Sequence, residues 1–142
     1  MHKALENLKP SYGGFSSALG GETTIADTIQ SATYVDMRYY DLAVAYGQAS
    51  GVAAGSVITL QLYEGTSTAG AGSATLSGKT DTFTSTNTTD TDVLQAEVRG
   101  QELSDGYRYV GARLSTSNAS GTEKVSLILL QGRPRFAANS LP

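Results

Sequence analysis

The chain has 142 residues, a net charge of −3 and 16% charged residues, with no Cys and a single His. This length supports one domain with a hydrophobic core. The slightly acidic balance argues against nucleic acid as a partner, because proteins that bind it usually carry a basic excess. The lack of Cys excludes disulfides and thiolate chemistry. No segment approaches the about 20 apolar residues of a membrane span, so we expect no membrane partner and no signal peptide, and a chain that stays in a cytoplasm until it assembles.

Residues 1–30 differ in composition from the rest, and we expect them to form a flexible N-terminal arm outside a single domain of residues 31–142. The stretch "SYGGFSSALGG" places aromatic residues on small-residue spacers. Two interpretations are open. One is a loosely ordered terminus. The other is an arm that docks Tyr12, Phe15 or Leu19 on a neighbouring subunit or a larger surface.

From about Thr23 onward, short strand-like segments recur with turn signals between them. The clearest alternation is in "SVITLQLYEG", where Ile58, Leu60 and Leu62 would share one face. About eight such segments occur, without a convincing helix. They are "TTIADTI", "YVDMRYYDLAVAYGQ", "SVITLQLYEG", "SATL", "TDTFTSTN", "DVLQAEVRG", "YRYVGARLSTS" and "EKVSLILLQG". This pattern predicts an antiparallel sandwich or barrel in an all-β protein.

The segment "TSTAGAGSATLSGK" is expected to be a long loop of small residues that can contain a short strand at Ala74–Leu76. Part of it resembles a phosphate-binding loop, but five residues rather than four separate Gly72 and Gly78. The run that follows is strand-like, so no helix N-terminus would hold a phosphate. We therefore expect no nucleotide at this loop.

Other catalytic and metal motifs are equally weak. His2 lies beside Met1, where a buried and oriented catalytic histidine is rare, and a zinc site of Cys and His cannot be built. Acidic residues are present, but nothing marks two of them as a glycosidase pair. Asp90 and Asp92 offer oxygen ligands to Ca²⁺, although a hairpin turn capped by their side chains is the interpretation we favour. We predict no catalytic residue, metal or cofactor, and a binding or structural protein rather than an enzyme.

The tyrosines allow two interpretations. They could form a sugar-stacking platform, or lie at the edge of the core and at interfaces, because Tyr buries its ring and keeps its hydroxyl in water. The chain has no Trp, so we favour the structural role. The tyrosines concerned are Tyr34, Tyr39, Tyr40, Tyr46, Tyr63, Tyr107 and Tyr109.

The last predicted strand, in "EKVSLILLQGRPRF", departs from the one-sided pattern of the others. Val125, Leu127 and Leu129 would point to one side of it. Ile128 and Leu130 would point to the other. One face would pack inside the sandwich. The other would be covered by a neighbouring subunit or by a long loop of the same chain, and the sequence does not assign the two faces.

The C-terminal stretch "GRPRFAANSLP" carries Arg133, Arg135 and Phe136 on a segment stiffened by Pro. It would either be solvated or dock on an acidic surface through charge and one aromatic anchor.

Four stretches resemble the small head-decoration, or cement, proteins of tailed bacteriophages and related gene transfer agents. "TYVDMRYYDLAVAYGQASG" is similar to an opening strand pair with a Gly-containing turn, and "GSVITLQLYEGTS" to a strand that runs into a small-residue loop. "YRYVGARLSTS" is similar to an Arg-Tyr strand, and "VSLILLQGRPRF" to a closing apolar strand with a Gly-x-Pro exit. Together they span roughly residues 33–136, and residues 1–30 and the length of the loop 66–79 fall outside the resemblance.

The resemblance implies a jelly-roll-like β-sandwich of about eight strands without enzymatic activity. It implies a homotrimer, made in the host bacterial cytoplasm, that binds the major capsid protein on the exterior of the virion head. In some relatives such a protein also carries a head spike or fibre protein. The alternative is a carbohydrate- or receptor-binding sandwich of a phage spike or tail fibre. The residues that we expect at interfaces are Tyr12, Phe15, Ile128, Leu130, Arg133, Arg135 and Phe136.

Overall fold

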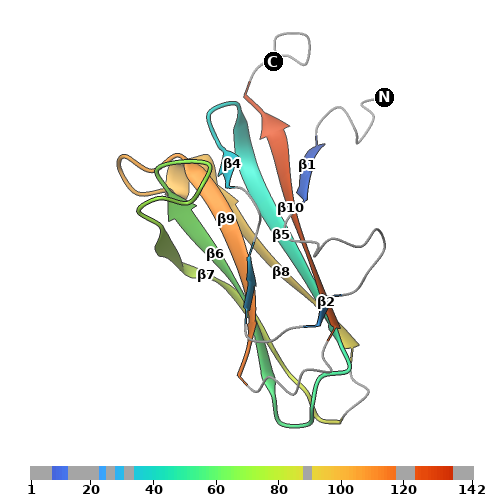
Figure 1. The fold of residues 1–142 in the computed structure, drawn as a ribbon. Helices are drawn as coiled ribbons and strands as arrows, with labels where there is room; N and C mark the ends of the chain where they lie inside the picture. The colour runs from blue at the N-terminus through green and yellow to red at the C-terminus, as the bar shows by residue number, and fades with distance from the viewer. Residues whose placement is uncertain are drawn as a thin grey trace, which may run out of the picture.

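Two antiparallel sheets pack face to face in the computed structural model, which describes residues 8–12, 23–24, 28–30, 34–87, 91–117 and 124–135 (Figure 1). Sheet A has the strand order β1 (Leu8–Tyr12), β10 (Lys124–Pro134), β5 (Tyr40–Ser50) and β8 (Thr91–Arg99), and β2 (Thr23–Thr24) also pairs with β10. Sheet B has the order β3 (Thr28–Gln30), β9 (Tyr109–Thr116), β6 (Val57–Gly65) and β7 (Ala74–Thr84), and β4 (Val35–Asp36) also pairs with β9. The helical segment in the described ranges is a 3-10 turn, η1 (Gly100–Glu102), and none of these ranges holds a helix that is long and apolar enough to cross a membrane.

The strands pair from the two ends of the chain inwards. β1 pairs with β10, β3 and β4 pair with β9, β5 pairs with β8, and β6 pairs with β7. This is the wrapped order of a jelly roll, which divides eight strand positions between two sheets. Because β2 lies beside β10 like β1, and β4 lies beside β9 like β3, the ten described segments occupy eight positions. The predicted fold class is confirmed.

The core lies between the sheets and is lined by one face of each long strand. Ile58, Leu60 and Leu62 of β6 are fully buried, as their alternation predicts. Sheet A contributes small residues to the same space. A Cβ added at Gly47 of β5 would lie 2.8 Å from Cδ1 of Leu114 in sheet B, so the absence of a side chain there lets the two sheets approach.

Residues 1–30, which their composition assigns to a flexible arm, contribute strands to both sheets. Leu8–Tyr12 pairs with the last strand, and Thr28–Gln30 pairs with β9. Pro10 is tolerated in β1 because this strand lies at the edge of sheet A. Strands this short show too few alternations to be recognised from periodicity alone.

The small-residue loop after β6 is shorter than its composition suggests, since β7 begins at Ala74. The register of β6 with β7 shifts between Gln61 and Tyr63, which marks a bulge. The side-chain amide of Gln61 donates to the carbonyl groups of Leu62, Leu76 and Lys79, at 2.8, 2.9 and 3.2 Å. These bonds satisfy backbone acceptors at the bulge, so β7 continues as one strand through its small residues.

Candidate functional site

The outward side of sheet A carries a strip of apolar side chains, which we call the outer strip: Val44, Tyr46, Ile128 and Leu130. Val44 lies outside the core cluster but is only 9% exposed. On β10, Val125, Leu127 and Leu129 are 3, 0 and 0% exposed and belong to the core. Ile128 and Leu130, which alternate with them, are half-buried and lie outside the core cluster. The two faces of β10 are therefore assigned: its odd-numbered residues from Val125 to Leu129 face the core.

The outer strip continues across the sheet in register. Ile128 lies opposite Tyr46, and Leu130 lies opposite Val44. Directly opposed side chains in an antiparallel pair have Cβ atoms about 4.5–5.5 Å apart, so each pair is in contact. Tyr46 is 36% exposed.

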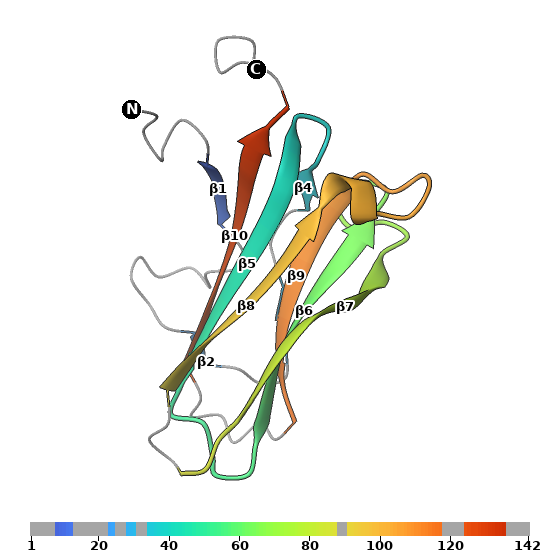
Figure 2. The same ribbon diagram turned by 180° about the vertical axis from the view of Figure 1, so that it is seen from behind.

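The outer strip has different neighbours on its two sides. On β8, polar residues lie opposite the strip, with Gln95 opposite Tyr46 and Glu97 opposite Val44. Val93, on the same face of β8, is 57% exposed. On β1, the backbone of Tyr12 is in register with Ile128. Figure 2 shows β1, β10, β5 and β8 side by side in this order. The structure thus brings Tyr12, Ile128 and Leu130, three of the predicted interface residues, to neighbouring register positions.

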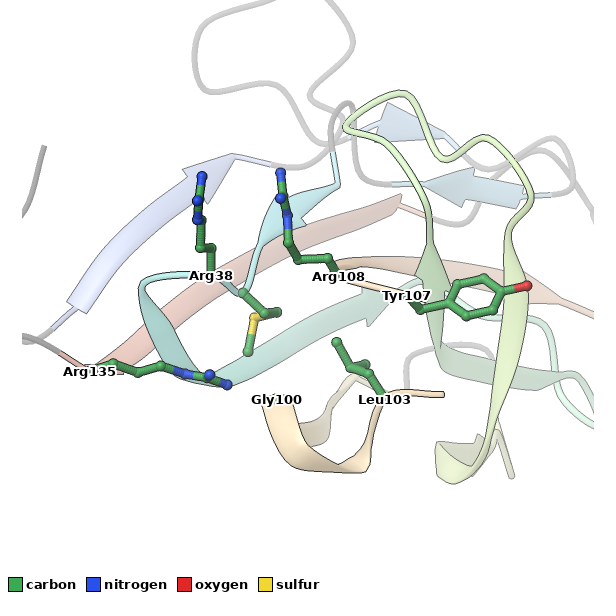
Figure 3. Close-up of a pocket in the computed structure, with 7 residues that line it drawn as sticks. Arg38, Gly100, Leu103, Tyr107, Arg108 and Arg135 are labelled. Carbon is green, nitrogen blue, oxygen red and sulfur yellow. The ribbon is translucent and has the colours of Figure 1, made fainter. Parts of the chain in front are cut away.

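A second feature lies at the end of the sandwich where β10 finishes and β5 begins. There the turn between β4 and β5, the link from β8 to β9 and the segment after β10 meet, because Pro134 is in register with Tyr40 and Leu42 with Arg99. They enclose a pocket of about 270 Å³ (Figure 3). Its lining residues are Met37, Arg38, Gly100, Leu103, Tyr107, Arg108 and Arg135.

One carboxylate organises two of the arginines in the pocket. Oδ1 of Asp36 accepts the backbone N–H of Arg38 at 2.9 Å and lies 3.0 Å from Nε of Arg108. Figure 3 shows the Arg38 and Arg108 side chains extending side by side. Arg108 also donates to the hydroxyl of Tyr109. This bond, with the charge of Asp36, raises the pKa of Arg108, so its guanidinium stays charged.

Arg135 enters the pocket from the segment after β10. Its N–H donates to the Tyr39 carbonyl at 2.9 Å, and its guanidinium lies 3.8 Å from Oδ1 of Asp41. A Cβ added at Gly100 would collide with this guanidinium, so the missing side chain at Gly100 leaves room for it. Arg133 has a positive φ of 54° and is exposed. Only Arg135 of the two tail arginines lines the pocket.

The link between β8 and β9 is held in place by two carboxylates. Oε1 of Glu102 lies 2.6 Å from Nζ of Lys79 in β7, and Oε2 accepts the N–H of Arg99 at 2.7 Å. The bond from Lys79, with a smaller contribution from Arg99, holds the pKa of Glu102 below its ordinary value of 4.5. Glu64 is buried and accepts the N–H of Ser104 at 2.8 Å. These bonds position Gly100, Leu103 and Arg108 around the pocket.

The tyrosines do not gather into one platform. Tyr34 is buried, with its ring against Gly65, Gly70 and Gly111. Tyr63 lies in sheet B under the guanidinium of Arg113, 4.4 Å from its ring centre. Tyr46 belongs to the outer strip. The others lie near the pocket end, namely Tyr39, Tyr40, Tyr107 and Tyr109.

Most of the remaining candidate residues lie outside the described ranges. Phe15, Leu19, Phe136 and Asp90 are not among the described residues, and Asp92 is exposed. In the described ranges no three acidic or histidine side chains form a group that could hold a metal ion.

Sequence reasoning missed Arg38 and Arg108, which line the pocket with Arg135. They are 70 positions apart and come together because Asp36 is in register with Tyr109. The signal in the sequence was the repeated Arg-Tyr step in "MRYY" and "YRYV", in which each arginine stacks on the tyrosine after it.

Comparison with known proteins supports the fold class and no more specific assignment. The chain matches no protein-family model and no curated protein. In shape it is similar to part of a chain in the structure of infectious bursal disease virus, Gx strain, with a TM-score of 0.51 and 12% identity. The match covers 92% of this chain and 33% of that one, so this chain spans about one third of the viral chain's length. The likeness agrees with the jelly-roll order of the strands.

Two other solved structures are more distantly similar. The CBM35 module from Cellvibrio japonicus Abf62 is 13% identical, with a TM-score of 0.43, and the match covers 89% of this chain and 96% of that one. A chain of the naturally occurring empty particles of cowpea mosaic virus is 8% identical, with a TM-score of 0.40, and the match covers 92% and 83% of the two chains. At these scores neither likeness carries an argument about function.

Proposed function

We propose that the protein is a non-enzymatic capsid decoration, or cement, protein of a tailed bacteriophage. In this role it binds the outer surface of the assembled head as a homotrimer, with the major capsid protein as its partner. The observation that carries the proposal is the outer strip of Val44, Tyr46, Ile128 and Leu130 on sheet A. The resemblance of residues 33–136 to decoration proteins supports the same role.

The outer strip needs a physical explanation because it faces away from the core. The outward side of the neighbouring strand β8 carries the exposed polar residues Gln95, Glu97 and Arg99, as in a sheet that faces water, together with Val93, which is 57% exposed. An apolar strip beside them favours association on a free monomer. In a closed trimer each copy of the strip would be covered by a neighbour, so the same apolar surface would hold the subunits together.

Decoration of this kind requires binding without chemistry. A protein that binds the assembled lattice better than free capsid subunits stabilises the lattice by mass action. A trimer presents three copies of every contact, so weak individual contacts add up to stable attachment. The pocket arginines and the residues after β10 would be repeated in the same way around the threefold axis.

Two measurements test the proposal together. Light scattering should give a mass near three times the 14.8 kDa of one chain, and the protein should co-sediment with expanded heads that lack their decoration protein. Heads with the protein bound should then resist heating to a higher temperature than bare heads. A monomer at micromolar concentration that does not bind such heads would contradict the proposal. A trimer that does not bind them would point to the alternative, a spike or fibre domain.

A further inference from the structure

We infer that the arginine pocket at the end of the sandwich binds the carboxylate of an acidic side chain from a protein partner. The pocket is lined by Arg38, Arg108 and Arg135 and by the apolar side chains of Met37 and Leu103. In Figure 3 the Arg38 and Arg108 side chains extend to one side, and the Arg135 side chain points toward Gly100. The inference concerns the pocket alone, whatever the role of the outer strip.

The size of the pocket is sufficient for an acidic side chain. Its volume of about 270 Å³ lies below the range of roughly 300–1,000 Å³ that is usual for small-molecule and cofactor sites. Met37 is buried and Leu103 is half-buried, so the floor offers apolar surface to the methylene groups of a glutamate.

The charges around the pocket leave one cation in surplus. Arg108 pairs with Asp36, and Arg135 lies near Asp41. The Arg38 guanidinium, by contrast, stacks on the Tyr39 ring at 5.6 Å and pairs with no carboxylate among the described residues. An incoming carboxylate would therefore supply the missing counter-charge.

The arginines also retain unused hydrogen-bond donors. A guanidinium has five N–H donors in a planar fork. Arg108 uses Nε for Asp36 and a terminal nitrogen for the Tyr109 hydroxyl, which leaves donors facing outward. The 3.8 Å separation between Arg135 and Asp41 is longer than a hydrogen bond, so Arg135 can turn to a carboxylate without breaking a short contact.

The same surroundings disfavour polyanions such as nucleic acid. Asp36 and Asp41 flank the arginines and would repel a second and third negative charge. A single carboxylate on a peptide neutralises the one surplus cation, which is why we assign the site to an acidic peptide segment.

The test uses the full-length protein and a capped Gly-Ser-Glu-Ser-Gly peptide, with its Gln-for-Glu counterpart as the control ligand. Binding is followed by NMR shifts of the arginine Nε–H groups and by calorimetry. We expect the Glu peptide to shift the pocket arginines and the Gln peptide to leave them unchanged. Arg38→Gln and Arg135→Gln should each weaken binding about tenfold, the effect of losing one charge-assisted hydrogen bond.

Three further variants make the test specific. Arg113→Gln removes the same charge from sheet B, away from the pocket, and should leave binding unchanged. Asp41→Asn should strengthen binding, because it frees Arg135. Gly100→Ala should weaken binding while leaving the melting temperature nearly unchanged, because its Cβ displaces only the end of the Arg135 side chain.

Several outcomes would overturn the inference. Equal binding of the Glu and Gln peptides, or no shift of the pocket arginines by the Glu peptide, would remove the carboxylate as the ligand. If Arg113→Gln and Arg38→Gln weakened peptide binding equally, the effect would come from the overall charge of the protein and not from the pocket. Displacement of the peptide by an equal concentration of inorganic phosphate would make the pocket a general anion site. None of these results depends on trimer formation or on capsids, so they leave the proposed function to its own test.

Discussion

The side-chain amide of Gln131 donates a hydrogen bond of 2.6 Å to the backbone carbonyl of Asp36, 95 positions earlier in the chain. Gln131 belongs to β10 and is only 4% exposed. Asp36 holds Arg38 and Arg108 through its carboxylate. The last strand thus fixes the turn that carries one wall of the pocket.

Replacing Gln131 with Ala should destabilise the protein by about 1–3 kcal/mol, because it removes a partly buried hydrogen bond to the Asp36 carbonyl. Urea unfolding followed by circular dichroism measures the change. Gln48→Ala is the matched control, since Gln48 is exposed on the neighbouring strand β5. Equal losses in the two variants would show that the Gln131 bond adds nothing.

A second prediction concerns the ring of Tyr34 and the backbone of Gly111. A Cβ at Gly111 would lie 2.6 Å from ring atoms of Tyr34, which is 7% exposed and cannot swing into solvent. Gly111→Ala should therefore cost about 1–3 kcal/mol of stability, the usual range for overpacking. In a Tyr34→Leu background the same change should cost much less. Additive losses would mean that the clash is relieved elsewhere.

The third prediction tests the outer strip. Ile128→Glu and Leu130→Glu should each convert the proposed trimer to a monomer of 14.8 kDa, because a charge would have to be buried between subunits. The monomer should keep its β-sheet circular dichroism, since the core face of β10 is unchanged. Gln95→Glu, opposite Tyr46 on β8, adds the same charge outside the strip and should leave the mass unchanged. Intact oligomers from both strip variants would locate the interface elsewhere.

The fourth prediction concerns acid. The pKa of Glu102 is lower in the folded state than in the unfolded chain. Its ion pair with Lys79 therefore stabilises the fold above pH 4.5. This contribution is lost as the pH falls through the folded-state pKa. The effect should be below about 1 kcal/mol, as for other exposed ion pairs. In Glu102→Gln the free energy of unfolding should fall less steeply in this range. Glu97→Gln, exposed on β8, is the control, and an identical pH profile of wild type and Glu102→Gln would contradict the prediction.

The sequence predicts those parts of the fold that depend on neighbours along the chain. The alternation of Ile58, Leu60 and Leu62 is enough to place β6, because each strand buries every second residue. The apolar residues of β10 indicate two covered faces, but only the structure assigns Leu127 to the core and Ile128 to the outside. Both faces carry similar side chains, so hydrophobicity alone cannot choose between them.

What the sequence cannot supply is pairing between distant segments. Leu8–Tyr12 is a strand because β10 lies beside it, and a five-residue stretch with a proline has little strand tendency of its own. The pocket depends on such pairings too. Arg38 and Arg108 meet only through the pairing of β4 with β9, and Arg135 joins them because the chain after β10 bonds to Tyr39.

The position of β10 also governs how the chain can fold during synthesis. The last long strand to be made lies between β1 and β5, so an incomplete chain leaves both of these strands with unpaired edges. Leu8 cannot meet Gly132 until β10 has left the ribosome. Sheet A therefore closes only once β10 is present, with the slow kinetics of folds dominated by distant pairings. A chain that terminates before β10 lacks a central strand of sheet A, and its open edges would make it a target for aggregation or proteolysis.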